Sequence, residues 1–357
     1  MHLPYNIELF PVSAFPFNKH SSVIRFLFHI PISIYLFVKM INFPQFFTLP
    51  SGDKIPVIGF GSGTKWQLKK KSENGGAENS KDVIDQDLVN MLKLAVKHGF
   101  VHLDTAECYT TRRDVGEALK QINLPRDELW ITDKYHCTGK DGMGNSRGPY
   151  GSLKEGLKLM GIDYVDLFLV HTCYFNEAYP IEKIWPEMER LKDEGLAHHI
   201  GVSNFDVTTL RKVLKLARHK PEVCQIEFHP YLQNQSTGII NFLKSNNILV
   251  EAYAPLAPLS RAKDGPLNEV LEKLSKKYGR STTQILLKWV HQQGIVTLTT
   301  TSKESRMDDI LDVFDFSLSP EDAKLISDTG NSYFFRAFNI PPLPTYDEEL
   351  KKERNLC

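Results

Sequence analysis

The sequence has few cysteines and no excess of charge of either sign. Its five cysteines are scattered along 357 residues, and they form neither a CxxC pair nor the Cys/His spacing of a zinc site. We therefore expect a reduced, cytoplasmic location and no metal. Lysine plus arginine and aspartate plus glutamate both number 43, so the formal net charge is zero. This balance gives no electrostatic reason to expect a nucleic-acid partner.

Long apolar runs are also scarce. The one candidate for a membrane anchor, residues 23–38, is interrupted by Arg25, His29 and Pro31. It is shorter than the roughly 20 apolar residues that a spanning helix needs, and no small-residue cleavage site follows it. We therefore expect no membrane association and interpret residues 1–39 as an extension outside the fold. A signal anchor is the alternative interpretation.

From residue 46 onward, strand-like and helix-like segments alternate. FFTL and KIPVIG predict an opening hairpin, with a Ser-Gly-Asp turn between them. Residues 87–98, 181–194 and 209–217 have apolar positions at helical spacing. The strand-like runs are VIGFG, VHLD, LWITDKY, VDLFLVH, HHIGVSN, VCQIEFH, ILVEAYAP and GIVTLTT. This pattern predicts an α/β fold, a (β/α)8 TIM barrel with an N-terminal β-hairpin, rather than an open sheet with a second domain.

The barrel is expected to occupy residues 40–335 and to leave residues 336–357 as a C-terminal tail. Residues 69–81 (KKKSENGGAENSK) are polar and contain glycine, which predicts a solvated loop. The segment FFRAF near the tail is a candidate to lie over the barrel mouth.

Four ionisable residues, Asp104, Tyr109, Lys134 and His171, lie at or just beyond the ends of strand-like runs. The C-terminal ends of barrel strands meet at one face, so these residues are expected to share a site. An ammonium favours a nearby phenolate, so Lys134 is expected to lower the pKa of Tyr109, with Asp104 holding Lys134 in place. His171 is expected to hydrogen-bond a substrate oxygen. The set suits protonation of a carbonyl oxygen while hydride arrives at carbon.

Each of these residues also has an ordinary structural interpretation. A single aspartate after a strand is usually a helix cap, a single tyrosine usually packs half-buried, and a single lysine is usually solvated. A single histidine can be a hydrogen-bonded core residue. Their shared strand-end placement favours the catalytic interpretation.

Tyr150 and Lys154 form a competing pattern, the YxxxK spacing of short-chain dehydrogenases. That family needs a GxGxxG turn after its first strand, whereas the glycine-rich turn here is Gly59-Phe60-Gly61-Ser-Gly. The YxxxK match is therefore rejected.

Several blocks carry a family resemblance: LDTAECYTTRRDVGEAL, ITDKYH, DLFLVH, IGVSNF, QIEFHPYLQ and EAYAPL. In this order they resemble the signature blocks of the aldo-keto reductase superfamily. Within it, FFTLPSGDKIP, ITDKY and TTTSK are most similar to the fungal NADPH-dependent α-keto amide reductases. The resemblance implies NADPH as cofactor and an aldehyde or an activated ketone as substrate.

The resemblance also implies a role for individual residues. Tyr109 would be the general acid, Lys134 and Asp104 its tuning pair, and His171 the substrate-orienting group. The remaining implied residues contact the cofactor. Ser203, Asn204 and Gln225 would hold the nicotinamide carboxamide, Tyr253 would stack on the ring, and Thr64, Pro255, Leu256, Ser302, Lys303 and Arg306 would complete the cofactor site.

The chain departs from the family pattern where the adenosine 2′-phosphate is expected. Aligned on Arg306, it has Thr300-Thr301 in place of Lys-Ser and Asp309-Ile310 in place of Glu-Asn. Lys303 is the candidate to replace the missing cation. The expected function is NADPH-dependent carbonyl reduction of a small-molecule substrate, and the alternative is a nucleotide-binding regulatory or sensor protein with little turnover.

Overall fold

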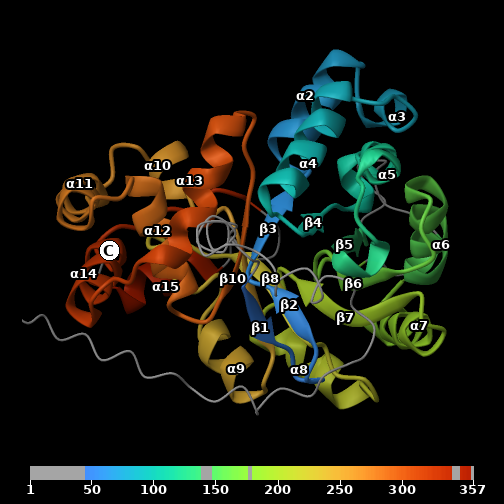
Figure 1. Ribbon diagram of the computed structural model, residues 1–357. Coiled ribbons are helices and arrows are strands. Elements are labelled where there is room, and N and C mark those ends of the chain that lie inside the picture. Colours follow the sequence, from blue (N-terminus) through green and yellow to red (C-terminus); the bar gives the residue numbers. More distant parts are fainter. Residues whose placement is uncertain (1–44, 138–146, 176–178, 340–345, 355–357) are drawn as a thin grey trace, which may run out of the picture. The chain divides into compact units, whose positions relative to one another are not determined.

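The computed structural model describes residues 45–137, 147–175, 179–339 and 346–354. Parallel strands close into a barrel in the order β10-β3-β4-β5-β6-β7-β8-β9, and helices surround it (Figure 1). The barrel strands are β3 (Ile58–Gly61), β4 (His102–Asp104), β5 (Trp130–Tyr135), β6 (Val165–Val170), β7 (Ala197–Ser203), β8 (Val223–Glu227), β9 (Leu249–Tyr253) and β10 (Val296–Thr299). Each strand coincides with one of the strand-like runs of the sequence, with β7 starting one residue earlier, so the predicted TIM barrel is confirmed.

Helices lie between the barrel strands and after the last of them. They are α2 (Lys65–Glu73), α3 (Ala77–Ser80), α4 (Gln86–His98), α5 (Arg112–Gln121), α6 (Gly148–Met160), α7 (Ile181–Asp193), α8 (Val207–Leu216), α9 (Ile239–Ser245), α10 (Ala257–Ser260), α11 (Leu267–Tyr278), α12 (Thr282–His291), α13 (Met307–Leu311), α14 (Pro320–Asn331) and α15 (Asp347–Glu353). Most of the longer helices present an apolar face to the barrel, as α4, α7 and α11 do. Short 3₁₀ turns add η3 (Glu107–Tyr109), η4 (Arg126–Glu128), η5 (Glu304–Arg306) and η6 (Asp312–Asp315).

Helix α4 illustrates why these segments are helical. Its buried residues recur at intervals of three and four, which gives one apolar face toward the strands. Asp85 caps the N-terminus by accepting hydrogen bonds from two backbone N–H groups, and Gly99 ends the helix with φ of 114°. The predicted helix at residues 87–98 is thus correct to within one residue.

The predicted N-terminal hairpin is also confirmed. Strands β1 (Phe46–Thr48) and β2 (Lys54–Pro56) pair antiparallel, with Thr48 opposite Lys54. Leu49 and Ile55 of the hairpin are buried against a small apolar cluster that includes Trp130 and Val223. Trp130 and Val223 are the first residues of β5 and β8, so the hairpin covers the N-terminal end of the barrel.

One prediction is wrong. Residues 69–81 are not a solvated loop: they contain most of α2 and all of α3, with only a short turn between them. The buried residues of α2 are Trp66 and Lys70, and a lysine does not register as apolar in a periodicity search. The helix therefore left no hydrophobic pattern in the sequence.

The segment after α14 returns to the barrel mouth, as FFRAF indicated. The backbone N–H groups of Ala337 and Phe338 donate to the carboxylate of Glu227, the last residue of β8, at 2.5 and 3.0 Å. The rings of Phe338 and Tyr253 form a T-shaped pair, with 5.5 Å between their centroids. Tail residues therefore lie against the C-terminal ends of β8 and β9.

The apolar stretch at residues 23–38 lies outside the described residues, and the interpretation of residues 1–39 as an extension stays a prediction. Within the part of the chain that the structure describes, no helix is both long and apolar enough to cross a membrane.

Candidate active site

The four ionisable residues singled out in the sequence lie together at the C-terminal face of the barrel. Asp104 ends β4, Tyr109 ends the 3₁₀ turn that follows, Lys134 lies near the end of β5, and His171 directly follows β6. The phenol oxygen of Tyr109 lies 3.5 Å from Nε2 of His171. The ammonium of Lys134 lies 5.0 Å from the centre of the Tyr109 ring. Four neighbouring elements, β4, η3, β5 and β6, thus bring these side chains into one cluster.

Lys134 is held by a buried ion pair. Its Nζ lies 2.6 Å from both carboxylate oxygens of Asp104 and donates to the backbone oxygen of Thr105 at 2.9 Å. Lys134 is fully buried and Asp104 is nearly so. Burial raises the pKa of Asp104, while Lys134 opposes that shift by favouring the carboxylate. The pair fixes the ammonium beside the tyrosine ring.

A second buried carboxylate adjoins this pair. The side-chain amide of Gln225 donates to Asp104 at 3.1 Å and to Glu251 at 2.6 Å. Burial first, and then the charge of Asp104, raise the pKa of Glu251 to about 8. One lysine therefore faces two carboxylates, and Glu251 is the one that keeps its proton at neutral pH.

The pKa of Tyr109 differs from the expectation. Burial raises it well above the usual value, and the negative charge of Asp104 raises it further. The net pKa is therefore raised and not lowered as predicted, because burial and the charge of Asp104 outweigh the influence of Lys134. Tyr109 is consequently a protonated phenol at neutral pH, which is the form that can donate a proton.

His171 is neutral at this site. Burial lowers its pKa well below the usual value, and the nearby Lys134 and His136 act in the same direction. A neutral imidazole carries one N–H and one acceptor nitrogen. It can therefore hydrogen-bond a substrate oxygen without adding a charge.

The turn after β3 packs directly on the tyrosine. A Cβ atom on Gly63 would lie 2.6 Å from Cε2 of Tyr109, so a glycine is required for the ring to occupy this position. The next residue, Thr64, has φ of 43°, which a β-branched residue rarely adopts, and its hydroxyl does not cap α2.

Backbone strain is concentrated around the same mouth. Of the non-glycine residues with positive φ in the described part of the chain, all but Asn247 follow a barrel strand on its C-terminal side. Such conformations cluster at functional sites. The residues at the mouth are Thr64, Thr110, Asn204 and Ala254.

The residues expected to hold the nicotinamide carboxamide lie on or just after the adjacent strands β7 and β8. Ser203 ends β7 and Asn204 follows it, while Gln225 is in the middle of β8. The amide nitrogen of Asn204 donates to the backbone oxygen of His171 at 2.9 Å, and its oxygen accepts from the hydroxyl of Tyr253 at 2.8 Å. The hydrogen bonds tie Tyr253 to the β7 end. The structure brings these four residues into one region, and their cofactor role stays a prediction.

The remaining predicted cofactor residues lie farther round the mouth. Pro255 and Leu256 follow β9, and Pro255 is buried. Ser302, Lys303 and Arg306 follow β10 and are exposed, with Lys303 just before η5 and Arg306 at its end. Lys303, the N-cap of η5, and Arg306, its last residue, therefore lie on the same exposed segment.

The sequence analysis missed a third cation at this place. Lys65, the first residue of α2, hydrogen-bonds Ser302, and the indole N–H of its neighbour Trp66 donates to Thr300 at 3.0 Å. The contacts join the β3–α2 turn to the segment after β10. The only sequence signal was the position of Lys65 directly after Thr64.

Two more lysines of α2 support the segment that carries Tyr109. Nζ of Lys71 donates to the backbone oxygen of Cys108, and Nζ of Lys70 donates to that of Thr110, both at 2.7 Å. The carbonyl groups on either side of Tyr109 are therefore both anchored to α2. The segment expected to be a solvated loop in fact supports the candidate site.

Enzymes of the (β/α)8 fold carry their active sites at the C-terminal ends of the barrel strands. The cluster of ionisable side chains described above lies at this place. Residues 58–330 match the Aldo/keto reductase family, so the chain belongs to this family of oxidoreductases.

Individual relatives support the same assignment. The NADPH-dependent alpha-keto amide reductase of Saccharomyces cerevisiae is 42% identical over 294 residues, which cover 80% of this chain and 91% of that protein. The NAD/NADP-dependent indole-3-acetaldehyde reductase of Schizosaccharomyces pombe is 38% identical over 289 residues, with coverage of 80% and 96%. The solved structure of a Bombyx mori aldo-keto reductase in complex with NADP has a TM-score of 0.70 and 25% identity, and covers 85% of this chain and 98% of that one. The resemblance seen in the sequence is thus confirmed.

Proposed function

We propose that the protein reduces aldehydes or activated ketones, such as α-keto amides and α-keto esters, to alcohols with NADPH as the hydride donor. The observation that carries this proposal is the cluster of Tyr109, His171, Lys134 and Asp104 at the barrel mouth. The two fungal relatives, named as reductases of alpha-keto amides and of indole-3-acetaldehyde, support a carbonyl substrate.

In this proposal Tyr109 gives its proton to the carbonyl oxygen as the alcohol forms. Burial keeps the phenol protonated, and a neutral His171 holds the same oxygen in place by a hydrogen bond. Lys134 lies close enough to the ring to stabilise the phenolate that proton transfer leaves behind. Positioned acids of this kind typically accelerate reactions by about 10² to 10⁴.

The described residues fit a phosphorylated dinucleotide. Lys65 hydrogen-bonds Ser302, and Lys303 and Arg306 follow Ser302 in the same exposed segment. A planar guanidinium together with an ammonium would match a 2′-phosphate well. Asn204 and Gln225 offer amide groups near the mouth for a carboxamide. Tyr253 offers an aromatic ring beside them, which also packs nearly at right angles to Phe338.

The experiment that tests the proposal is a panel of carbonyl compounds incubated with the full chain and either NADPH or NADH. The panel contains α-keto amides, α-keto esters, diketones and aromatic aldehydes, and oxidation of the cofactor is followed by its absorbance. We expect turnover with at least one class and faster turnover with NADPH. Tight cofactor binding without turnover on any compound would instead favour the regulatory or sensor alternative.

We also propose that residues 1–39 are an extension that the barrel does not need. The family match begins at residue 58, and the described hairpin begins at Phe46. A chain that starts at Met40 should therefore be as active and as heat-stable as the full chain. A lower melting temperature after truncation, or recovery of the full chain with membranes, would contradict this.

A further inference from the structure

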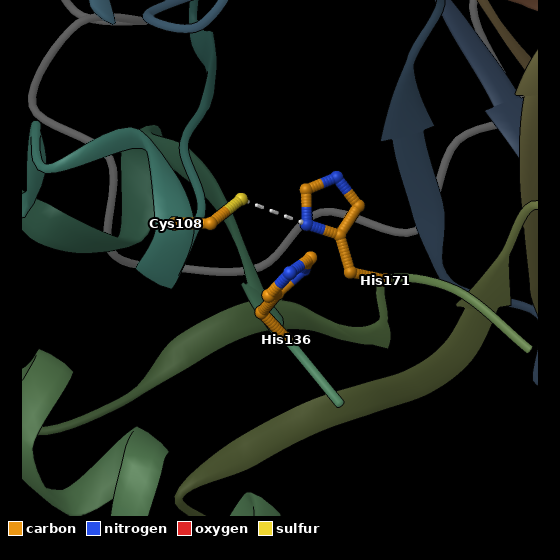
Figure 2. A group of neighbouring side chains, drawn as sticks. All are labelled: Cys108, His136 and His171. Atoms are coloured by element: carbon orange, nitrogen blue, oxygen red, sulfur yellow. Dashed lines mark hydrogen bonds between the residues drawn. The ribbon is translucent and has the colours of Figure 1, made fainter. Parts of the chain in front are cut away.

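Three side chains with metal-binding atoms converge beside Tyr109. Cys108 lies in η3, His136 directly follows β5, and His171 directly follows β6. Figure 2 shows the Cys108 thiol pointing at the His171 ring, with the His136 ring below both. One sulfur and one nitrogen from each histidine all lie within 4.8 Å of one another. The three residues are far apart in the sequence, so their spacing does not match a metal-ligand motif.

The distances suit a small thiophilic cation. Sγ of Cys108 lies 3.4 Å from Nδ1 of His171. Zinc bonds of about 2.3 Å to sulfur and 2.0–2.1 Å to nitrogen at a tetrahedral angle separate the two ligand atoms by about 3.6 Å. The pair therefore already has the required separation, and the ring of His136 lies 5.7 Å from that of His171, centroid to centroid.

The charges around the cluster are compatible with an ion. The carboxylate of Glu107 accepts a hydrogen bond from the backbone N–H of His136 at 3.1 Å, which joins the Cys108 turn to the end of β5. Two ammonium groups lie near the cluster: Lys71 donates to the backbone oxygen of Cys108 at 2.7 Å, and Lys134 is paired with Asp104 at 2.6 Å. A divalent ion with one thiolate and two neutral imidazoles would carry one net positive charge, and Glu107 lies close enough to offset it.

We propose that Cys108, His136 and His171 form a binding site for a divalent transition metal ion of the zinc type, with a fourth coordination position left for water. On binding, the thiol of Cys108 releases its proton to solvent and the thiolate becomes a ligand. The ring of His171 binds through Nδ1, so Nε2 keeps its hydrogen and continues to face Tyr109. Three protein ligands of these types with one open position are a usual zinc arrangement.

Occupancy of this site should inhibit the proposed carbonyl reduction. The ion would tie the His171 ring to the Cys108 turn, 3.4 Å away, and so fix the side chain that is proposed to orient the substrate oxygen. This consequence rests on the proposed function, whereas metal binding itself does not.

The test uses the full-length chain with Zn²⁺ in equilibrium dialysis and with Co²⁺ in absorption spectroscopy. We expect one tightly bound ion per chain, together with a thiolate-to-cobalt charge-transfer band and the strong visible bands of tetrahedral cobalt. Cys108→Ser should remove the charge-transfer band, and Cys108→Ser and His136→Phe should each weaken zinc binding at least about 100-fold. Glu107→Gln should weaken it about 10- to 100-fold, because it removes only a supporting carboxylate.

Cys137→Ser is the matched control. Cys137 is also buried and lies next to His136, but its thiol donates to the backbone oxygen of Thr172. This variant should keep both the band and the affinity, and thermal melts of all variants verify that they fold. Undiminished zinc binding by Cys108→Ser and His136→Phe would overturn the proposal and place the ion at a surface group such as His98 with Glu304 and Asp308. Cobalt bound without a thiolate band would overturn it as well, and neither result depends on catalysis.

Discussion

The ammonium of Lys70 lies 2.5 Å from the carboxylate of Asp114, and their side chains expose only 1% and 0% of their surface. The same ammonium donates to the backbone oxygen of Thr110, the residue after Tyr109. The other carboxylate oxygen of Asp114 accepts from the backbone N–H of Asp85, the N-cap residue of α4. One buried ion pair thus connects α2, α4, α5 and the turn that carries the candidate proton donor.

Lys70→Met should destabilise the protein by about 3–5 kcal/mol, because it leaves Asp114 buried without its charge partner. Urea unfolding measures this loss. The control is Lys81→Met in the same region, where Lys81 pairs with Glu78 at the surface. That variant should leave the unfolding midpoint nearly unchanged, since exposed ion pairs contribute little. If both substitutions changed the unfolding midpoint equally, the buried pair would contribute no more to stability than the exposed one.

Tyr109→Phe should abolish carbonyl reduction and leave NADPH affinity near wild type. The ring still packs on Gly63, and only the hydroxyl that donates the proton is lost. Tyr150→Phe is the control, because the hydroxyl of Tyr150 binds Glu194 on the exposed side of α6. Steady-state kinetics and cofactor titration distinguish the two variants. Retention of most of kcat in Tyr109→Phe would refute the assignment of the proton donor.

Lys134→Met should also disable turnover, because the phenolate formed by proton transfer loses its nearest positive charge. The variant leaves Asp104 buried without its charge partner, so we expect a loss of about 3–5 kcal/mol in stability as well. The two effects are separated by measuring single-turnover rates under conditions where thermal melts show a folded protein. A folded variant with the wild-type rate and pH profile would show that Lys134 does not act on Tyr109.

Glu251 should make the protein less stable as the pH rises. Its pKa in the folded chain is about 8, whereas the usual value for glutamate is about 4.3. The folded state therefore binds this proton more tightly than the unfolded state. The resulting stability is fully present below about pH 4.3 and is lost as the pH rises through about 8.

Glu251→Gln removes this titration and retains the hydrogen-bonding shape of the side chain. Urea unfolding from about pH 5 to about pH 8 should show a flatter dependence of stability on pH than in the wild type. Glu272→Gln, on the exposed side of α11, should retain the wild-type dependence. An unchanged slope in Glu251→Gln would mean that Glu251 is ionised in the folded protein.

Arg306→Ala should weaken NADPH binding by roughly 1–3 kcal/mol, the usual cost of losing a hydrogen bond to a charged group, with little effect on NADH. The reason is that only NADPH carries the 2′-phosphate that the guanidinium is proposed to bind. Fluorescence titration with both cofactors measures the difference. Arg218→Ala, which removes an exposed arginine paired with Asp193, should change neither affinity. Equal weakening of both cofactors by Arg306→Ala would show that this arginine does not contact the phosphate.

The fold could be predicted from the sequence because each strand is a local apolar run. Side chains of parallel barrel strands are buried on both faces, so runs such as VDLFLV are recognisable without any knowledge of their neighbours. The candidate catalytic residues were recognisable for the same reason. Asp104, Lys134 and His171 occur at or just after the ends of such runs, and the barrel brings these ends to one face.

Only the tertiary structure decided which charges meet and what they do to one another. Lys134 is close to Tyr109 as predicted, but burial and the charge of Asp104 outweigh it, so the pKa of the phenol is raised and not lowered. The helical segment with Lys70, and the convergence of Cys108 with His136, depend on partners many residues away. A sequence determines local apolar patterns, whereas burial and pairing of charges are set by long-range contacts, which change both the sign and the size of electrostatic effects.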